Sequence, residues 1–299
     1  MASLQDVYVN PLTDYGFKKL FGEEPNKDIL IEFLNDMLPG GRRIVDLQYL
    51  KNEHLGGTPV DRKAIFDLYC KGENGERFIV ELQKAKQNFF KDRSIYYSSF
   101  PIQEQGLKGE WNFRLEAVYT IGILDFIFDE HRETEELYHV VELKNQRNEV
   151  FYDKLKYIYI ELPKFKKTAD ELSSRRDKWL YIFRYLSELT ERPAPLQERI
   201  FSKLFEVARI SNFTPEERQD YEESLKYYRD MNNVVSTSFE EGREEGREEG
   251  REEGREEGRQ LGAEQKALEV ARELLELKLP LAVIMQATGL DEAQIEALR

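Results

Sequence analysis

Residues 63–83, KAIFDLYCKGENGERFIVELQ, carry the pattern from which the central strands can be predicted. Apolar and β-branched side chains fill residues 63–71 and 77–84, and the segment between them holds Gly72, Asn74 and Gly75, which are typical of a turn. The pattern predicts a β-hairpin. Asp67, Glu81 and Gln83 interrupt strands that are otherwise apolar, and local conflicts of this kind are expected at functional sites.

The length of the turn determines whether Asp67 and Glu81 meet. A two-residue loop would put Asp67 and Glu81 on opposite faces of the hairpin. A three-residue loop over residues 73–75, with Gly75 in the left-handed conformation, would pair Gly72 with Glu76 and Asp67 directly with Glu81. We favour this second register, because a glycine at the third loop position is what such a turn requires.

Two carboxylates directly opposite one another on a hairpin call for a cation. Their Cβ atoms would lie about 4.5–5.5 Å apart, and like charges at that distance repel. Carboxylate oxygens are ligands preferred by Mg²⁺ and Mn²⁺. The alternative is that both acids lie on a solvent-facing strand and pair with Lys63, Lys71 or Arg77, and the spacing alone leaves both interpretations open.

The rest of the first 238 residues predicts helices on both sides of further strands. Helices are expected from Thr13 or Asp14 to Gly22, over about 26–38 and over 88–100, where Pro101 should kink or end the helix. Strands are expected at 43–51, 115–126, 138–143 and 156–162, and helices fill about 168–231 with a break at Pro193 and Pro195. This order predicts an α/β fold with a mixed sheet flanked by helices.

Composition excludes several classes of protein. The 299 residues are 40% hydrophobic, contain no apolar run long enough to span a membrane and begin without a secretory signal, so we expect a cytoplasmic protein. The single Cys70 cannot form an internal disulfide, and His54, His131 and His139 lack zinc-ligand spacing, so no Cys/His metal site is expected. Sequence motifs of serine hydrolases, phosphate-binding loops and dinucleotide-binding turns are absent, so any catalysis should depend on carboxylates.

Charge is unevenly distributed along the chain. The net charge is −14, but the repeat at 240–259 contributes 10 Glu and 5 Arg, and residues 1–239 carry only −6. Lys84, Lys86, Lys91 and Arg93 form a basic stretch directly after Gln83, and Lys18 lies on the first helix. Such residues can bind a phosphate backbone. The alternative is an ordinary charged helix face, with the tyrosines that follow packed inward.

The C-terminal region begins with five copies of Glu-Glu-Gly-Arg. Each glycine costs a helix about 1 kcal/mol relative to alanine, and Glu and Arg three residues apart can form ion pairs. We expect a semi-rigid helical spacer or a self-associating helix. Residues 261–278 predict an amphipathic helix, and residues 281–298 resemble a small helix-turn-helix that presents mostly acids, so oligomerisation or partner binding fits its charge better than DNA reading.

Five segments together resemble the PD-(D/E)XK nuclease superfamily, and most closely its branch of transposases and recombination-promoting nucleases. They are Thr13–Gly22, Asp61–Asp67, Val80–Gln83, the helix residues Arg93 and Tyr96-Tyr97, and Ile160–Phe165. The sequence departs from the superfamily pattern in two places, since no proline precedes Asp67 and Gln83 replaces the usual lysine. The closer branch is similar in having Glu-x-Gln.

The resemblance implies a restriction-endonuclease-like αβββαβ core at 1–165, a helical extension at 166–238, the repeat at 239–260 and a tail at 261–299. It also implies a DNA endonuclease that uses Mg²⁺, with Mn²⁺ or Ca²⁺ as alternatives. A catalytically inactive binding module that recruits partners through the C-terminal helix, and a transposase, are the other interpretations; a homo-oligomer formed through that helix is a further expectation. The expected catalytic residues are Asp67, Glu81 and Gln83, the metal ligands Asp67, Glu81 and Asp14, and the DNA-binding residues Lys18, Lys84, Lys86, Arg93 and Tyr97.

Overall fold

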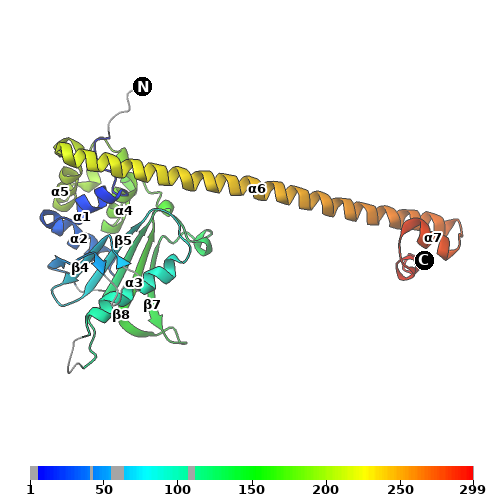
Figure 1. The fold of residues 1–299 in the computed structure, drawn as a ribbon, viewed down its shortest axis with the longest axis horizontal. Coiled ribbons are helices and arrows are strands. Elements are labelled where there is room, and N and C mark those ends of the chain that lie inside the picture. Colours follow the sequence, from blue (N-terminus) through cyan, green and yellow to red (C-terminus); the bar gives the residue numbers. More distant parts are fainter. Residues whose placement is uncertain (1–5, 41–42, 55–63, 107–111, 299) are drawn as a thin grey trace. The chain divides into compact units, whose positions relative to one another are not determined.

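The computed structural model describes residues 6–40, 43–54, 64–106 and 112–298 (Figure 1). The motif residues 61–63 lie outside the described residues. The chain divides into two compact units, Met1–Asn233 and Val234–Arg299. Among the described residues, no helix is both long and apolar enough to cross a membrane.

Two short helices open the first unit, as the sequence predicts. Helix α1 runs Asp14–Phe21, and the Thr13 hydroxyl caps it by accepting a hydrogen bond from the backbone N–H of Gly16 at 3.0 Å. Helix α2 runs Lys27–Met37 after a turn of 3₁₀ helix, η1, at Glu24–Asn26. Both helices bury apolar residues at helical spacing, so each has one face packed into the core.

A mixed sheet forms the centre of the first unit. Strand β5 is parallel to β6, and β6 to β8, while β1, β4 and β7 pair antiparallel with their neighbours. The mixed sheet is therefore confirmed. In spatial order its described strands are β1 Leu47–Tyr49, β4 Leu68–Gly72, β5 Arg77–Gln83, β6 Val118–Leu124, β8 Val150–Glu161 and β7 Tyr138–Lys144.

The β4–β5 hairpin has the predicted register. Leu68 pairs with Val80, and the backbone N–H of Gly72 donates to the carbonyl of Glu76 at 2.9 Å. Gly75 has a φ of +92°, the left-handed conformation that this loop was expected to need. The described ladder ends at Leu68; the same register continued by one residue would place Asp67 beside Glu81, whose pKa the Asp67 carboxylate raises. A glycine that tolerates a positive φ thus brings the two acids together.

The expected continuous strand over 63–71 is wrong, because the chain bends at Asp67. Ala64–Ile65 instead forms β3, which pairs with β2 at Glu53–His54 in a separate two-stranded sheet. Phe66 consequently packs with Tyr69, rather than on the same face as Leu68 as strand alternation predicts. The Asp67 carboxylate accepts a hydrogen bond from the backbone N–H of Leu82 at 2.6 Å, and such side-chain bonds compete with regular strand pairing.

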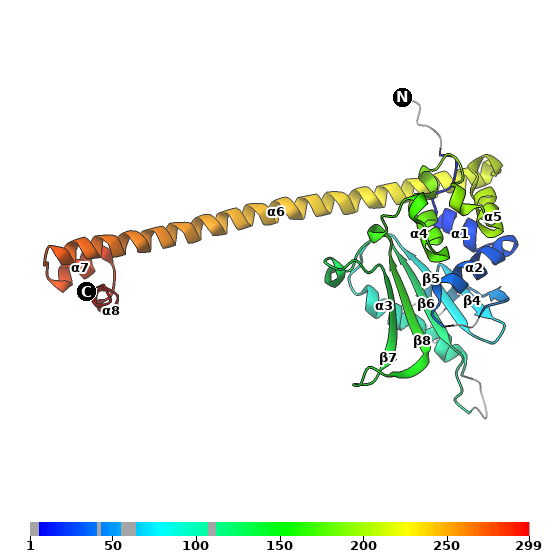
Figure 2. The same cartoon turned by 180° about the vertical axis from the view of Figure 1, so that it is seen from behind.

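Helices cover both faces of the sheet (Figures 1 and 2). Helix α3, Phe90–Glu104, covers one face and continues through Pro101, so the helix ends later than expected. On the other face lie α1, α2, α4 at Arg175–Tyr185 and α5 at Arg199–Ala208. Cys70 points into this second layer, and burial raises the pKa of its thiol to about 12. Short 3₁₀ turns lie in the connections between strands and helices: η2 Asp129–His131, η3 Leu162–Lys164, η4 Ala169–Glu171, η5 Leu186–Glu188, η6 Ala194–Leu196 and η7 Ile210–Asn212.

Strand β8 is longer than the sequence predicts. It begins at Val150 and forms an antiparallel hairpin with β7 that the alternation of residues 144–155 did not reveal. Many side chains of its first half are partly or fully exposed, so the apolar signal that marks a buried strand begins only near Tyr157. Strand β1, at Leu47–Tyr49, is shorter than the expected strand at 43–51.

Helix α6 runs Pro215–Glu276 and includes the whole Glu-Glu-Gly-Arg repeat. In the first unit, its Tyr221 is buried and the hydroxyl accepts a hydrogen bond from the Asn10 backbone at 3.0 Å. In the second unit, the repeat is exposed and its arginines pair with glutamates three residues earlier, as at Arg247 and Arg259. Helices α7, Leu281–Thr288, and α8, Glu292–Glu296, pack with the end of α6 around Ala271, Ile284, Leu290 and Ile295.

Candidate active site

A small cavity lies where α1 meets the end of β5. Its volume is about 170 Å³, and its lining includes Asp14, Asp67, Gln83 and Lys84. A neighbouring cavity of about 770 Å³ shares Asp14 and Lys84 and adds Lys18. The structure therefore brings together one acid from α1, one acid from the bend before β4 and polar residues from the end of β5, all of which the sequence had singled out.

Asp67 is held in place by main-chain contacts at the bend. Besides the bond from Leu82 to its carboxylate, its backbone carbonyl accepts a hydrogen bond from the Asn52 amide at 2.9 Å. Burial raises the pKa of Asp67, the Leu82 hydrogen bond opposes that rise, and the nearby Asp14 carboxylate adds to it. Backbone hydrogen bonds thus position Asp67, but its negative charge is only partly offset by its surroundings.

The Glu81 carboxylate lies in a less favourable electrostatic environment than the Asp67 carboxylate. Its Oε1 atom is buried and accepts no hydrogen bond from any residue that the structure describes. Burial and the adjacent Asp67 carboxylate raise the pKa of Glu81 to about 8, although Arg93 acts in the opposite direction. Glu81 lines neither cavity, and among the described residues its carboxylate forms no three-ligand group with Asp14 and Asp67. Two neighbouring carboxylates with one unused buried oxygen offer the oxygen ligands that a divalent cation takes.

Gln83 is buried and held at both ends of its amide. Its Nε2 donates to the Ala85 carbonyl at 2.8 Å, and its Oε1 accepts from the Arg93 guanidinium. An amide oxygen has two lone pairs, so one acceptor site remains. Arg93 itself lies against the rings of Phe90 and Tyr97, and it therefore acts here as a clamp on Gln83.

Asp14 does not cap α1, because Thr13 does. Asp14 is instead half-exposed and pairs with Lys18 across one helical turn, at 3.0 Å. Lys84 lies over the ring of Tyr227 at 5.5 Å, and burial lowers its pKa. Asp14, Lys18 and Lys84 all border the larger cavity. Its described lining holds three cations and four acids in all: Lys18, Lys19, Lys84, Asp14, Glu23, Asp220 and Glu223.

The other predicted DNA-binding residues are less free than the sequence implies. Lys86 forms an ion pair with Asp129, and Lys91 with Glu130, so acids of η2 offset part of the basic stretch. Tyr97 packs edge-on against Phe66 in a partly buried cluster. Contacts between residues about 40 positions apart leave no mark in local sequence, which is why the pattern alone does not reveal them.

Sequence reasoning did not single out three groups near the same edge of the sheet. Asp125 follows β6, has its pKa raised by burial and accepts a hydrogen bond from the Tyr228 hydroxyl at 2.8 Å. Tyr227 covers Lys84. His131, His139 and Glu161 form a third group. A usable signal was the presence of acids directly at the ends of β6 and β8, since parallel strands bring their carboxyl ends to one edge.

Glu81 makes the stability of the metal-free protein depend on pH. Below pH 4.5, the ordinary pKa of a glutamate, Glu81 is protonated in both the folded and the unfolded state. Between that pH and about pH 8 it stays protonated only in the folded state. This contribution is therefore fully present at low pH and is lost as pH rises through about 8. In EDTA, urea unfolding should show a smaller fall in stability between about pH 5 and about pH 8 for Glu81→Gln than for wild type. Glu149→Gln, on an exposed turn, is the matched control; an unchanged pH dependence in Glu81→Gln would contradict the raised pKa.

Comparison with known proteins supplies the family. A family model described as the PD-(D/E)XK nuclease family transposase matches residues 11–238. A second, described as the C-terminal HTH domain of the Rpn/YhgA-like nuclease family, matches residues 264–299, the region in which the sequence resembled a helix-turn-helix. No curated protein and no solved structure matched the chain. The first match covers most of the chain and agrees with the mixed sheet and its flanking helices, so the restriction-endonuclease-like fold class is confirmed and the chain belongs to the PD-(D/E)XK nuclease family of transposases.

Proposed function

We propose that this protein is a metal-dependent DNA endonuclease that hydrolyses phosphodiester bonds at the cavity that Asp14, Asp67 and Gln83 line. One observation carries the proposal: the Asp67 carboxylate lies near enough to the buried Glu81 carboxylate to raise its pKa, and a buried oxygen of Glu81 has no partner among the described residues. Membership in a nuclease family supports the same reaction class. DNA recombination or action on foreign DNA is the corresponding biological setting.

Each side chain at the site has a separate role in the proposed hydrolysis. Asp67 and Glu81 would hold the cation, and Asp14, whose carboxylate pairs with Lys18 here, would have to turn toward them to add a third oxygen ligand from α1. A divalent cation in such a site neutralises phosphate charge and lowers the pKa of an attacking water. Gln83 uses its remaining lone pair to orient that water, while Arg93 fixes the amide. Lys18 and Lys84, which line the neighbouring cavity, would contact backbone phosphates.

The proposal is tested with supercoiled plasmid and purified full-length protein. Incubation with Mg²⁺ or Mn²⁺ should convert plasmid to nicked or linear product, and EDTA should stop the conversion. Ca²⁺ is included because it is a larger ion that the same oxygen ligands can bind. Plasmid that stays supercoiled with every ion, at protein concentrations well above the DNA concentration, would overturn the proposal.

A binding module without catalysis is the second candidate. It is favoured by Gln83, which replaces the lysine usual in the superfamily and whose amide oxygen is already engaged by Arg93. In that case the protein should bind DNA or a partner and leave plasmid intact. Transposase activity is the third candidate, and strand-transfer products joined to target DNA, rather than simple nicks, would identify it.

Lys84→Ala should weaken DNA binding without changing the sequence preference. A lysine that contacts phosphate contributes to affinity through counterion release. Its loss should therefore make the negative slope of log affinity against log salt concentration shallower by about 1. Fluorescence anisotropy with a labelled duplex measures this in an Asp67→Asn background, where cleavage does not interfere. Lys166→Ala, an exposed lysine outside the cavity, is the matched control. Equal slopes for Lys84→Ala and its parent would remove Lys84 from the DNA contact.

A further inference from the structure

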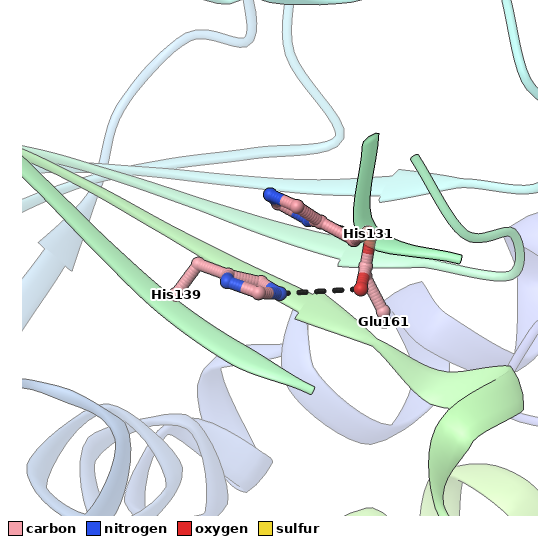
Figure 3. A group of neighbouring side chains, drawn as sticks. All are labelled: His131, His139 and Glu161. Carbon is pink, nitrogen blue, oxygen red and sulfur yellow. Dashed lines mark hydrogen bonds and ion pairs between the residues drawn. The ribbon is translucent and has the colours of Figure 1, made fainter. Parts of the chain in front are cut away.

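A second group of candidate ligands lies at the end of β8. Nδ1 of His131 is 3.1 Å from Oε1 of Glu161, and Nε2 of His139 is 3.1 Å from Oε2 of the same carboxylate (Figure 3). The two imidazole rings stack with centroids 4.1 Å apart and planes 21° apart. One ligand atom from each residue can therefore face a common point, and these atoms lie within 4.8 Å of one another.

These distances match those of a metal site. Ligands about 2.0–2.1 Å from a tetrahedral ion lie about 3.3 Å from each other. The observed separations between imidazole nitrogen and carboxylate oxygen are close to that value.

The surroundings hold the carboxylate in place. Glu161 is fully buried, its Oε1 accepts a hydrogen bond from the Phe128 backbone at 2.8 Å, and Lys164 lies 2.8 Å from its Oε2. Lys164 also donates to the Glu136 carbonyl at 2.8 Å, so it has another partner if it leaves the carboxylate. Outer contacts of this kind orient metal ligands, while the lysine charge opposes a cation.

We propose that His131, His139 and Glu161 bind a late first-row divalent metal ion, with Zn²⁺ as the physiological occupant. Two imidazoles and one carboxylate are the ligand types of zinc and related ions, whereas Mg²⁺ prefers oxygen alone. A fourth position would be left for water. The site ties together η2, β7 and the end of β8, three segments that otherwise meet at the edge of the sheet.

This site is separate from the one proposed for nuclease activity. Glu161 pairs with Leu124 in the sheet, and Leu124 pairs with Gln83, so Glu161 lies two strands from Gln83, or about 10 Å. The ligand chemistry also differs, because Asp67, Glu81 and Asp14 offer only oxygen. Zinc binding is therefore measurable without any reference to cleavage, and the failure of one proposal leaves the other intact.

Competition with a chromophoric chelator tests the proposal on untagged full-length protein. Wild type should take up one Zn²⁺ per chain at this site, and His131→Ala and His139→Ala should each weaken that binding by at least about tenfold. His54→Ala, which removes the remaining histidine of the chain, should bind like wild type. Lys164→Ala should bind Zn²⁺ several-fold more tightly, because the competing cation is gone.

A spectroscopic readout keeps the test decisive if a histidine variant fails to fold. Co²⁺ bound to wild type should give the intense visible bands of a four- or five-coordinate ion, and Zn²⁺ should displace them. Wild type that takes up neither ion, or His131→Ala and His139→Ala proteins that are folded and bind Zn²⁺ as wild type does, would overturn the proposal. The group would then be a buried ion-pair network centred on Glu161.

Discussion

Asp67→Asn should lower the rate of plasmid nicking in Mg²⁺ by at least about 100-fold, the scale seen when a group that stabilises transition-state charge is removed. The substitution keeps an oxygen that can still accept the hydrogen bond from Leu82 at the bend, so the backbone geometry is preserved. What it removes is one negative charge beside Glu81. The loss would therefore report on cation binding and catalysis rather than on folding. Time courses at equal folded concentration measure it.

Asp170→Asn is the matched control for that experiment. Asp170 is an exposed aspartate in η4, away from the cavity, and its substitution should leave the nicking rate unchanged. Glu81→Gln should reduce nicking to a similar extent as Asp67→Asn. If Asp67→Asn cleaves as fast as wild type while wild type is clearly metal-dependent, the hairpin acids are not the catalytic centre and another acid at this edge of the sheet must be sought.

Phe21→Ala should destabilise the protein by about 3–5 kcal/mol, the range for truncating a fully buried phenylalanine. Phe21 is inaccessible to solvent and its ring lies 5.3–5.4 Å from those of Phe17, Phe33 and Phe183, in parallel stacking with the last. These rings come from α1, α2 and α4, so the truncation leaves a cavity where three helices meet. Urea unfolding monitored by circular dichroism measures the change.

Phe151→Ala provides the comparison for that measurement. Phe151 lies in β8 with 79% of its surface exposed, so its loss should change stability by less than about 0.5 kcal/mol. Similar destabilisation by both substitutions would mean that the cluster around Phe21 is not part of the cooperative core.

Local sequence predicted the elements whose causes are local. Thr13 could be expected to cap α1, and Gly75 to adopt a positive φ that brings Asp67 opposite Glu81, because both effects depend on neighbouring residues. The bend at Asp67 was not predictable in this way. It involves a hydrogen bond to Leu82, fifteen residues away, and apolar residues on both sides of Asp67 continue the strand pattern.

Part of the candidate site depends on contacts that only the fold creates. The acids that neutralise Lys86 and Lys91 come from η2, and the His131, His139 and Glu161 group is assembled from three separate elements. Histidine spacing along the chain suggested no metal site, since zinc motifs are recognised only when their ligands are close in sequence. Side chains from β7 and β8 meet because the strands pair, at separations that no local motif encodes.

The rate at which a thiol reagent labels the buried Cys70 reports on local unfolding of the protein. Cys70 is the single cysteine of the chain, it lies in the middle of β4, and burial suppresses its ionisation. Thiol reagents attack the thiolate, so labelling must wait until the strand separates from the helices above it. The labelling rate therefore measures the local unfolding of the hairpin that carries Asp67 and Glu81, and no engineered probe is needed.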